Sequence, residues 1–300
     1  MSTRPRSAGA ATRPQHPSIK SGAKVVDPRL SPEQVGHFRK EGYLLYLENV
    51  FTPRKFARLK DHFERLLAAL PAEKRPEAMD VPHFSDLELF DWLFDDEVLD
   101  LVEPLLGPDI ALYSSHFICK PKGDGRRVPW HEDSAYWGSA SQRRDALIDP
   151  MELVTVWLAI DPSTKKNGCM YVIPRTHNTG RRGYSNYHQV DPGKNVFMVE
   201  IDPAQREESR AVPCILEPNQ CSLHDSRLIH GSPPNRSALR RCGYTMRYIR
   251  SSTRLSDEAR TFHQIYLARG RDLAGQAYAD PTKRYEELFQ QRTSAGRKGH

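Results

Sequence analysis

Helical spacing of apolar residues marks the first third of the chain, after a leader that lacks it. Residues 1–28 are rich in Ser, Thr, Pro, Ala and Arg, and we predict a disordered basic leader. Residues 31–41 open with Ser-Pro-Glu-Gln, a capping-box pattern that predicts a helix, and a short strand is expected at 42–47. Apolar residues at helical spacing predict further helices over 52–70 and 96–106.

Short apolar or alternating runs replace this spacing from residue 110 onward. Pro, Gly, Asn and Asp separate the runs, which is typical of strands joined by turns. The expected strands cover residues 110–120, 153–160, 169–173, 196–201, 212–216, 221–224 and 243–249. Helices followed by many short strands predict a mainly β fold, a sandwich or barrel with flanking helices. We expect helix again over 255–292, packed through Leu267, Leu273, Tyr285, Leu288 and Phe289.

Composition supports one folded domain. The chain has 300 residues, of which 38% are hydrophobic, and we place a single domain at 29–292 and a flexible tail at 293–300. No run approaches the roughly 18 apolar residues of a membrane span, and the start lacks the apolar core of a secretory signal. The five cysteines are scattered without a C-x-x-C pair, which excludes a disulfide scaffold or zinc ribbon and predicts a cytoplasmic protein.

The net charge of +6 is concentrated at the two ends. Residues 1–29 carry six basic groups and one acid, and residues 283–300 carry five basic groups and two acids. The rest of the chain is therefore slightly acidic. We expect no nucleic-acid partner, because the basic charge lies in the predicted leader and tail rather than on a folded surface. The oligomeric state is left open.

The segment Val128-Pro-Trp-His-Glu-Asp133 is the sharpest chemical motif. In an extended chain His131 and Asp133 project to the same face. His230 ends a short apolar run before Gly-Ser-Pro-Pro and is the candidate third ligand. Two histidines and one carboxylate on one face of a metal leave three positions open, as in non-haem Fe(II) oxygenases. An H-x-D pair alone is more often a surface turn, and His224 is a weaker alternative ligand.

Arg241 begins a later predicted strand, eleven residues after His230. An arginine that faces into a barrel needs an anion, and its planar fork suits a carboxylate. The C5 carboxylate of 2-oxoglutarate is such an anion, and the other end of 2-oxoglutarate can chelate iron. The ordinary alternative is that Arg240 and Arg241 form a solvated surface pair.

Together these motifs resemble one family. The matching stretches are Phe38-Arg-Lys-Glu-Gly-Tyr43, Gly107-Pro-Asp-Ile, Cys119-Lys-Pro-Lys-Gly, Pro129-Trp-His-Glu-Asp-Ser-Ala-Tyr-Trp137, Val154-Thr-Val-Trp-Leu-Ala-Ile-Asp161, Asn167-Gly-Cys-Met-Tyr-Val-Ile-Pro174 and His230-Gly-Ser-Pro-Pro-Asn235 with Arg241. Over about residues 31–250 the chain resembles the phytanoyl-CoA dioxygenase (PhyH) family of Fe(II)- and 2-oxoglutarate-dependent oxygenases.

The resemblance implies a double-stranded β-helix, a cupin-like jelly roll with helices outside its larger sheet. It implies that His131, Asp133 and His230 hold Fe(II), and that Arg241 and Ser232 pair with 2-oxoglutarate. The further cosubstrate candidates are Trp157, His116 and Thr155, and the candidates for the substrate pocket are Tyr136, Trp137, His177 and Arg182. Related halogenases carry a small residue where Asp133 stands, so hydroxylation of a small molecule is expected, consuming O2 and releasing succinate and CO2.

Two departures from the family pattern stand out: the first bears on a contact with the cosubstrate, and the second, at the site entrance, bears on the substrate class. Glu132 stands where relatives commonly have Gln, and Arg175-Thr-His177 replaces the usual Gly-Ser-His. The alternatives that remain are a cupin-like metalloenzyme or a binding protein that does not use 2-oxoglutarate. Binding of nucleic acid through the tails is a further, weaker alternative. The substrate itself is not predicted.

Overall fold

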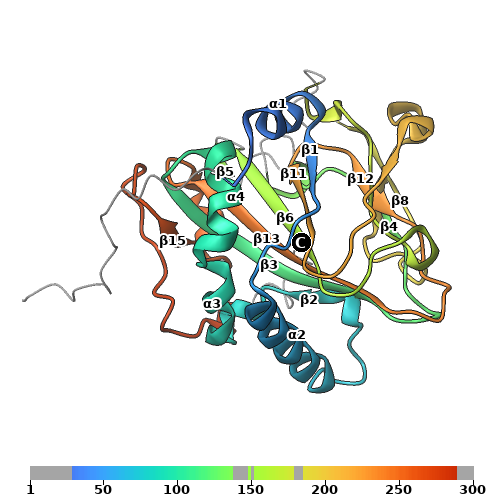
Figure 1. Ribbon diagram of the computed structural model, residues 1–300, viewed down its shortest axis with the longest axis horizontal. Coiled ribbons are helices and arrows are strands. Elements are labelled where there is room, and N and C mark those ends of the chain that lie inside the picture. Colours follow the sequence, from blue (N-terminus) through green and yellow to red (C-terminus); the bar gives the residue numbers. More distant parts are fainter. Residues whose placement is uncertain (1–28, 138–147, 150–151, 179–184, 289–300) are drawn as a thin grey trace, which may run out of the picture.

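The computed structural model places two antiparallel sheets against each other, with the main helices beyond the larger sheet (Figure 1). It describes residues 29–137, 148–149, 152–178 and 185–288. The predicted leader and tail at 1–28 and 293–300 lie outside these residues and stay predictions. The fold is the predicted mainly β jelly roll, a double-stranded β-helix.

The larger sheet runs through the middle of the molecule. Its strand order is β1 (Tyr43–Tyr46), β11 (Cys221–Asp225), β6 (Leu153–Ala159), β13 (Arg241–Arg250), β3 (Ile110–Lys120) and β15 (Tyr266–Arg269), and β2 (Met79–Asp80) also pairs with β3. The smaller sheet has the order β10 (Val212–Pro213), β7 (Tyr171–Val172), β12 (His230–Ser232) and β4 (Val128–His131). Two further pairs are β5 (Ile148–Asp149) with β14 (Arg254–Leu255), and β8 (Tyr187–Gln189) with β9 (Val199–Ile201).

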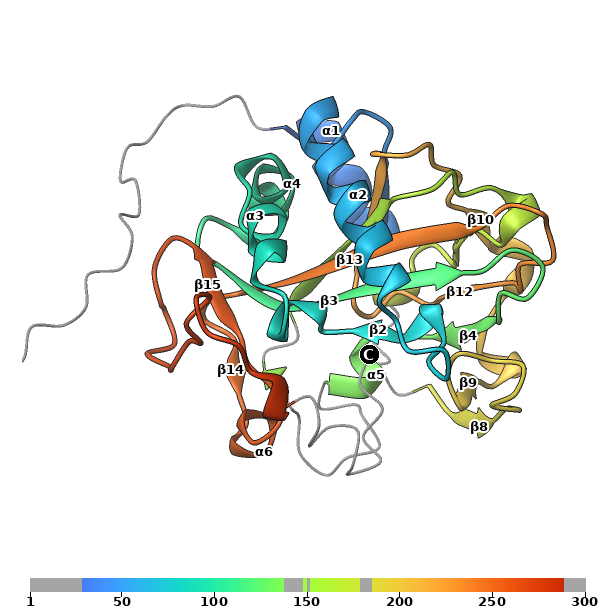
Figure 2. The ribbon, with the colours of Figure 1, turned by 90° about the horizontal axis from the view of Figure 1, so that it is seen from below.

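The helices gather mainly on one side of the larger sheet. The α-helices are α1 (Pro32–Glu41), α2 (Pro53–Ala68), α3 (Phe90–Leu93), α4 (Asp96–Leu106), α5 (Ser134–Trp137) and α6 (Asp257–Arg260). Figure 2 shows α2, α3 and α4 on one side of β3 and β13, with β4 and the β8–β9 hairpin on the other. The predicted capping box is confirmed: Ser31 accepts a hydrogen bond from the Gln34 backbone, and Gln34 accepts one from the Ser31 backbone.

Strand alternation sorts β13 into two faces of different character. Tyr244, Met246 and Tyr248 belong to the large apolar core shared with α2 and α4. The alternate residues Arg241 and Arg247 line a cavity between the sheets, yet both are almost fully buried. The outer face of this strand therefore stabilises the fold, and the inner face presents charged and polar groups to the cavity.

Gly243 on the same strand is required by a close approach of Trp157. A Cβ atom at residue 243 would lie 2.0 Å from Cζ2 of the Trp157 ring. Real Cβ atoms do not come this close to other heavy atoms, so only glycine leaves room for the indole. This contact fixes Trp157 on the inner face of the larger sheet.

The prediction of helix over 255–292 is wrong for most of its described part. That part holds α6 and β15 instead, and β15 pairs with β3. Gly270 and Gly275 both have positive φ, which interrupts any continuous helix. Leu273 is 52% exposed rather than packed, whereas Tyr285 and Leu288 pack against the large core as expected.

The predictions about membrane spans and cysteines can be compared with the structure. Among the described residues, no helix is long and apolar enough to cross a membrane. All five cysteines are buried free thiols. The predicted cytoplasmic location remains a prediction.

Candidate functional site

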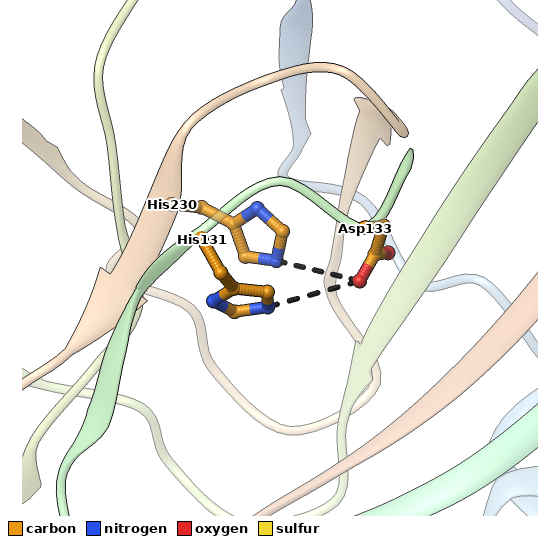
Figure 3. Close-up of side chains that lie close together, drawn as sticks. All are labelled: His131, Asp133 and His230. Atoms are coloured by element: carbon orange, nitrogen blue, oxygen red, sulfur yellow. Dashed lines mark ion pairs between the residues drawn. The ribbon is translucent and has the colours of Figure 1, made fainter. Parts of the chain in front are cut away.

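The smaller sheet brings His131, Asp133 and His230 together. In the smaller sheet, β4 pairs with β12 so that His131 and His230 stand directly opposite each other, and Asp133 follows β4. Oδ1 of Asp133 lies 3.7 Å from Nε2 of His131 and 4.0 Å from Nε2 of His230 (Figure 3). One ligand atom of each residue lies within 4.8 Å of the others. All three side chains are buried.

Hydrogen bonds to the backbone orient both imidazole rings. Nδ1 of His131 lies 2.8 Å from the Pro129 carbonyl oxygen, and Nδ1 of His230 lies 2.9 Å from that of Leu228. Nδ1 donates in each case, because a carbonyl can only accept, and Nε2 is left with the lone pair. Burial lowers the pKa of His131 to about 3 and also lowers that of His230, so both rings are neutral, as metal ligation requires.

Asp133 is an ionised carboxylate with its two oxygens in different roles. Burial alone would raise its pKa, but the Arg247 guanidinium holds that pKa well below its usual range. Oδ2 accepts a hydrogen bond from Thr155 Oγ1 at 3.2 Å and lies 3.4 Å from Nε of Arg247. Oδ1 is buried and accepts no hydrogen bond from any residue that the structure describes. The donor set therefore fits a divalent cation, which would bind Oδ1 and the two Nε2 atoms.

Thr155 acts through the carboxylate, so Thr155→Val is expected to weaken metal binding. Valine keeps the shape of the side chain but cannot donate to Oδ2, and loss of such a supporting hydrogen bond typically costs about 10–100-fold in metal affinity. Titration of the apoprotein with Fe(II) under anaerobic conditions measures this change. Thr155→Ser keeps the hydroxyl and should bind iron nearly as well as the parent protein. Equal affinity in Thr155→Val and Thr155→Ser would contradict this role.

Arg241 and Ser232 form a polar clamp in the same cavity. Arg241 is 1% exposed, and its Nη2 atom donates to the Gly168 carbonyl at 2.8 Å and to Ser232 Oγ at 3.1 Å. Its guanidinium lies over the Trp157 ring, 5.3 Å from the centroid. Among the described residues, Nη1 of Arg241 makes no hydrogen bond. The Nη1 edge of the guanidinium can therefore donate to an anion. Arg241, Ser232 and Trp157, which the resemblance assigns to the cosubstrate, lie together in the structure.

Lys120 is a buried lysine that the sequence did not single out for this clamp. Its Nζ atom donates to Ser232 Oγ at 2.6 Å and also to the backbone carbonyls of Ser232 and Pro233. Burial, and then the charge of Arg241, put its pKa well below the usual range. Because Ser232 Oγ accepts from both Lys120 and Arg241, its own hydroxyl proton is left to donate into the cavity.

Lys120→Met should therefore loosen the clamp. The substitution leaves buried acceptors without their donor, and we expect a stability loss of about 1–3 kcal/mol and a weaker grip on any carboxylate at the clamp. Thermal unfolding and a 2-oxoglutarate titration measure the two effects. Lys122→Met, two residues further on and exposed, is the matched control and should change neither. If the two variants behave alike, Lys120 does not hold the clamp.

Four further residues were predicted to line the cosubstrate or substrate site, and the structure gives each a different set of contacts. Thr155 contacts Asp133 rather than the Arg241 clamp. His116 is buried on β3, and its Nε2 atom lies 3.1 Å from the Glu77 carbonyl. Tyr136 lies near the ligands, with its ring 6.1 Å from that of His131. Trp137 packs on Tyr113 and lies under the Arg247 guanidinium.

Of the predicted pocket residues, His177 is placed away from the metal ligands. His177 lies against α1, where its Nε2 atom is 3.1 Å from the Arg39 carbonyl, and it is absent from the residues that line the metal cavity. Arg182 lies outside the described residues. The alternative ligand His224 is close, but its Nε2 atom lies 3.9 Å from Oδ2 of Asp133, the oxygen that faces Arg247, and His224 is not one of the three residues whose ligand atoms converge.

Phe197 and Arg247 also line the cavity and were not predicted. The Phe197 ring stands edge-on to the His131 ring, with centroids 4.8 Å apart. A signal for Arg247 exists in the sequence, because it follows Arg241 at an even spacing on one strand and must share its face. No local pattern marks Phe197, which reaches the cavity through the connection before β9.

The family model of phytanoyl-CoA dioxygenase (PhyH) matches residues 38–243, more than half of the chain. The chain belongs to the PhyH family. The peroxisomal phytanoyl-CoA dioxygenase of Bos taurus is 26% identical over 230 residues, which are 69% of this chain and 65% of that protein. The chain thus spans about two thirds of the length of this PhyH relative.

Solved structures share the fold. The non-heme monooxygenase ThoJ superposes with a TM-score of 0.62 at 23% identity, covering 88% of this chain and 95% of ThoJ. EctD from S. alaskensis with bound Fe has a TM-score of 0.58 at 22% identity, covering 79% of this chain and 83% of EctD. This likeness supports the double-stranded β-helix fold.

Proposed function

We propose that this PhyH-family chain is an Fe(II)- and 2-oxoglutarate-dependent dioxygenase that hydroxylates an aliphatic C–H bond of a small molecule. One observation carries the proposal: His131 and His230, whose ligand atoms converge with that of Asp133, line the same buried cavity as Arg241. In the balanced reaction, one oxygen atom of O2 enters the substrate and the other enters succinate, while 2-oxoglutarate loses CO2.

Each residue has a defined part in this reaction. Bound Fe(II) would supply the open coordination positions at which 2-oxoglutarate and O2 react. Nε2 of each histidine and Oδ1 of Asp133 would hold it, while Thr155 fixes the carboxylate. Arg241 and the Ser232 hydroxyl would bind the C5 carboxylate of 2-oxoglutarate, and Trp157 would wall that end of the cavity.

Hydroxylation is favoured over halogenation because the Asp133 carboxylate takes the place that a halide ligand would need. The same cavity argues against the two alternatives that do not use 2-oxoglutarate. A cupin-like metalloenzyme of another class has no use for a buried, half-satisfied arginine beside the metal. A binding protein without catalysis has no need to keep all three ligands oriented by hydrogen bonds.

A metabolite screen tests the proposed reaction. Protein with Fe(II), 2-oxoglutarate and isotopically labelled O2 is incubated with a compound library in the presence and absence of chloride. We expect at least one compound to stimulate succinate formation and to gain one labelled oxygen atom, with no chlorinated product. Conversion of a compound without 2-oxoglutarate would instead establish the alternative enzyme class.

A further inference from the structure

Two buried side chains in the metal cavity have hydrogen-bonding atoms that the site described above does not use. Arg247 is 4% exposed and His224 is 1% exposed, and both line the cavity. In the described part of the chain, neither ring nitrogen of His224 makes a hydrogen bond. Arg247 uses Nε toward Asp133 and Nη1 toward Thr245 Oγ1 at 3.2 Å, and within the described chain its Nη2 atom makes no hydrogen bond.

Strand register places these two groups in one row. His224 on β11 is opposite Thr155 on β6, and Thr155 is opposite Arg247 on β13. Thr155 in turn donates to Oδ2 of Asp133. His224 and Arg247 therefore flank the metal-binding carboxylate from two strands, on the side of the oxygen that does not face the other ligands.

Arg241 and Arg247 occupy opposite ends of the same inner strand face. They are six residues apart on β13, which corresponds to a span of about 20 Å in extended chain. Arg241 contacts Ser232, two residues after one ligand, whereas Arg247 contacts Asp133 directly. In the proposed function, 2-oxoglutarate extends from Arg241 to the metal. Arg247 would then face the part of the cavity that 2-oxoglutarate does not fill, where the primary substrate would bind.

The local charges favour an anion there. The residues that line the cavity include Arg241 and Arg247 and no acid, with Asp133 just behind them. Iron(II) and the 2-oxoglutarate dianion would cancel each other, and Asp133 would cancel one arginine. One positive charge then remains, and the planar edge of Arg247 suits the two oxygens of a carboxylate.

We propose that Arg247, with His224 beside it, binds a carboxylate of the primary substrate. The substrate class is then a small carboxylic acid whose oxidised carbon lies close to its acid group. The inference rests on the proposed function, because it assigns Arg241 to 2-oxoglutarate and leaves Arg247 for the substrate. A purely structural Arg247, which only pairs with Asp133, would give no preference for acids.

The test uses defined probes and no turnover. Protein is loaded with Ni(II) and saturating 2-oxoglutarate, and then titrated with monocarboxylates from acetate to hexanoate and with the corresponding primary amides. Calorimetry or ligand-observed NMR gives the affinities. We expect each acid to bind at least about tenfold more tightly than its amide, as is usual for hydrogen bonds to a charged group. Equal affinities, or acids that compete with 2-oxoglutarate, would overturn the proposal.

Variants locate the effect. Arg247→Gln should remove the preference for acids while 2-oxoglutarate still binds, and His224→Phe should reduce it. Arg247→Lys keeps the charge next to Asp133 and should retain part of the preference, which guards against loss of folding in Arg247→Gln. A full preference in Arg247→Gln would overturn the proposal. Absence of any 2-oxoglutarate binding by the parent protein would instead count against the proposed function itself.

Discussion

Asp133→Ala is expected to abolish retention of Fe(II) and formation of succinate. Oδ1 of Asp133 is the atom on which both Nε2 atoms converge, and the other oxygen is held by Thr155 and Arg247. Loss of a group that only supports a ligand costs about 10–100-fold in metal affinity, so loss of the ligand itself should cost more. Iron content after gel filtration and succinate yield measure the two effects.

Controls separate this effect from misfolding. Alanine leaves Arg247 buried without its partner, which costs about 3–5 kcal/mol when a buried ion pair is broken. Asp133→Asn keeps the size of the side chain and an acceptor for Thr155, and it should also lose iron while retaining more stability. Asp225→Asn removes a carboxylate that pairs with Arg227 and should keep iron. Iron at parental levels in both Asp133 variants would contradict the assignment of the ligand.

Arg241→Met is expected to weaken 2-oxoglutarate binding and leave Fe(II) binding largely intact. Burial lowers the pKa of Arg241 to about 10, so it is still charged at neutral pH. Removing one partner of a buried, hydrogen-bonded charge pair costs about 2–5 kcal/mol, which corresponds to a loss of affinity of roughly 30-fold or more. The dissociation constant of 2-oxoglutarate from the metal-loaded protein measures it.

Arg240→Met is the matched control, because the neighbouring arginine points the other way. Arg240 donates to Glu64 at 2.6 Å and to Asp161 at 2.7 Å, outside the residues that line the cavity. Its loss should lower stability without changing 2-oxoglutarate affinity. The opposite pattern, with normal affinity in Arg241→Met and lost affinity in Arg240→Met, would show that Arg240 and not Arg241 binds 2-oxoglutarate.

Local signals in the sequence predicted α1, α2 and α4, and they singled out the three candidate ligands that the structure brings together. Ser31 and Gln34 form the capping box that their types and spacing predict. His131 and Asp133 follow from strand alternation, and His230 from its position at the end of a short apolar run. Each of these predictions depends on residues that are close in the chain, or on the alternation of side chains along one strand.

The contacts that could not be predicted from the sequence join segments that are far apart in the chain. Thr155 reaches Asp133, and Lys120 reaches Ser232, only because the sheets bring them together. The C-terminal region was predicted as helix, yet β15 completes the edge of β3, a partner more than a hundred residues earlier. His177 was placed near the site by its neighbours in the chain, and contact with α1 takes it elsewhere.

The most direct test of the central claim is a visible absorption spectrum under anaerobic conditions. Apoprotein is mixed with Fe(II) and then with 2-oxoglutarate. If His131, Asp133 and His230 hold iron beside the Arg241 clamp, a weak metal-to-ligand charge-transfer band should appear only when both are present, and Arg241→Met should require more 2-oxoglutarate to reach it. Folded, iron-loaded protein that shows no such band at saturating 2-oxoglutarate would contradict the account.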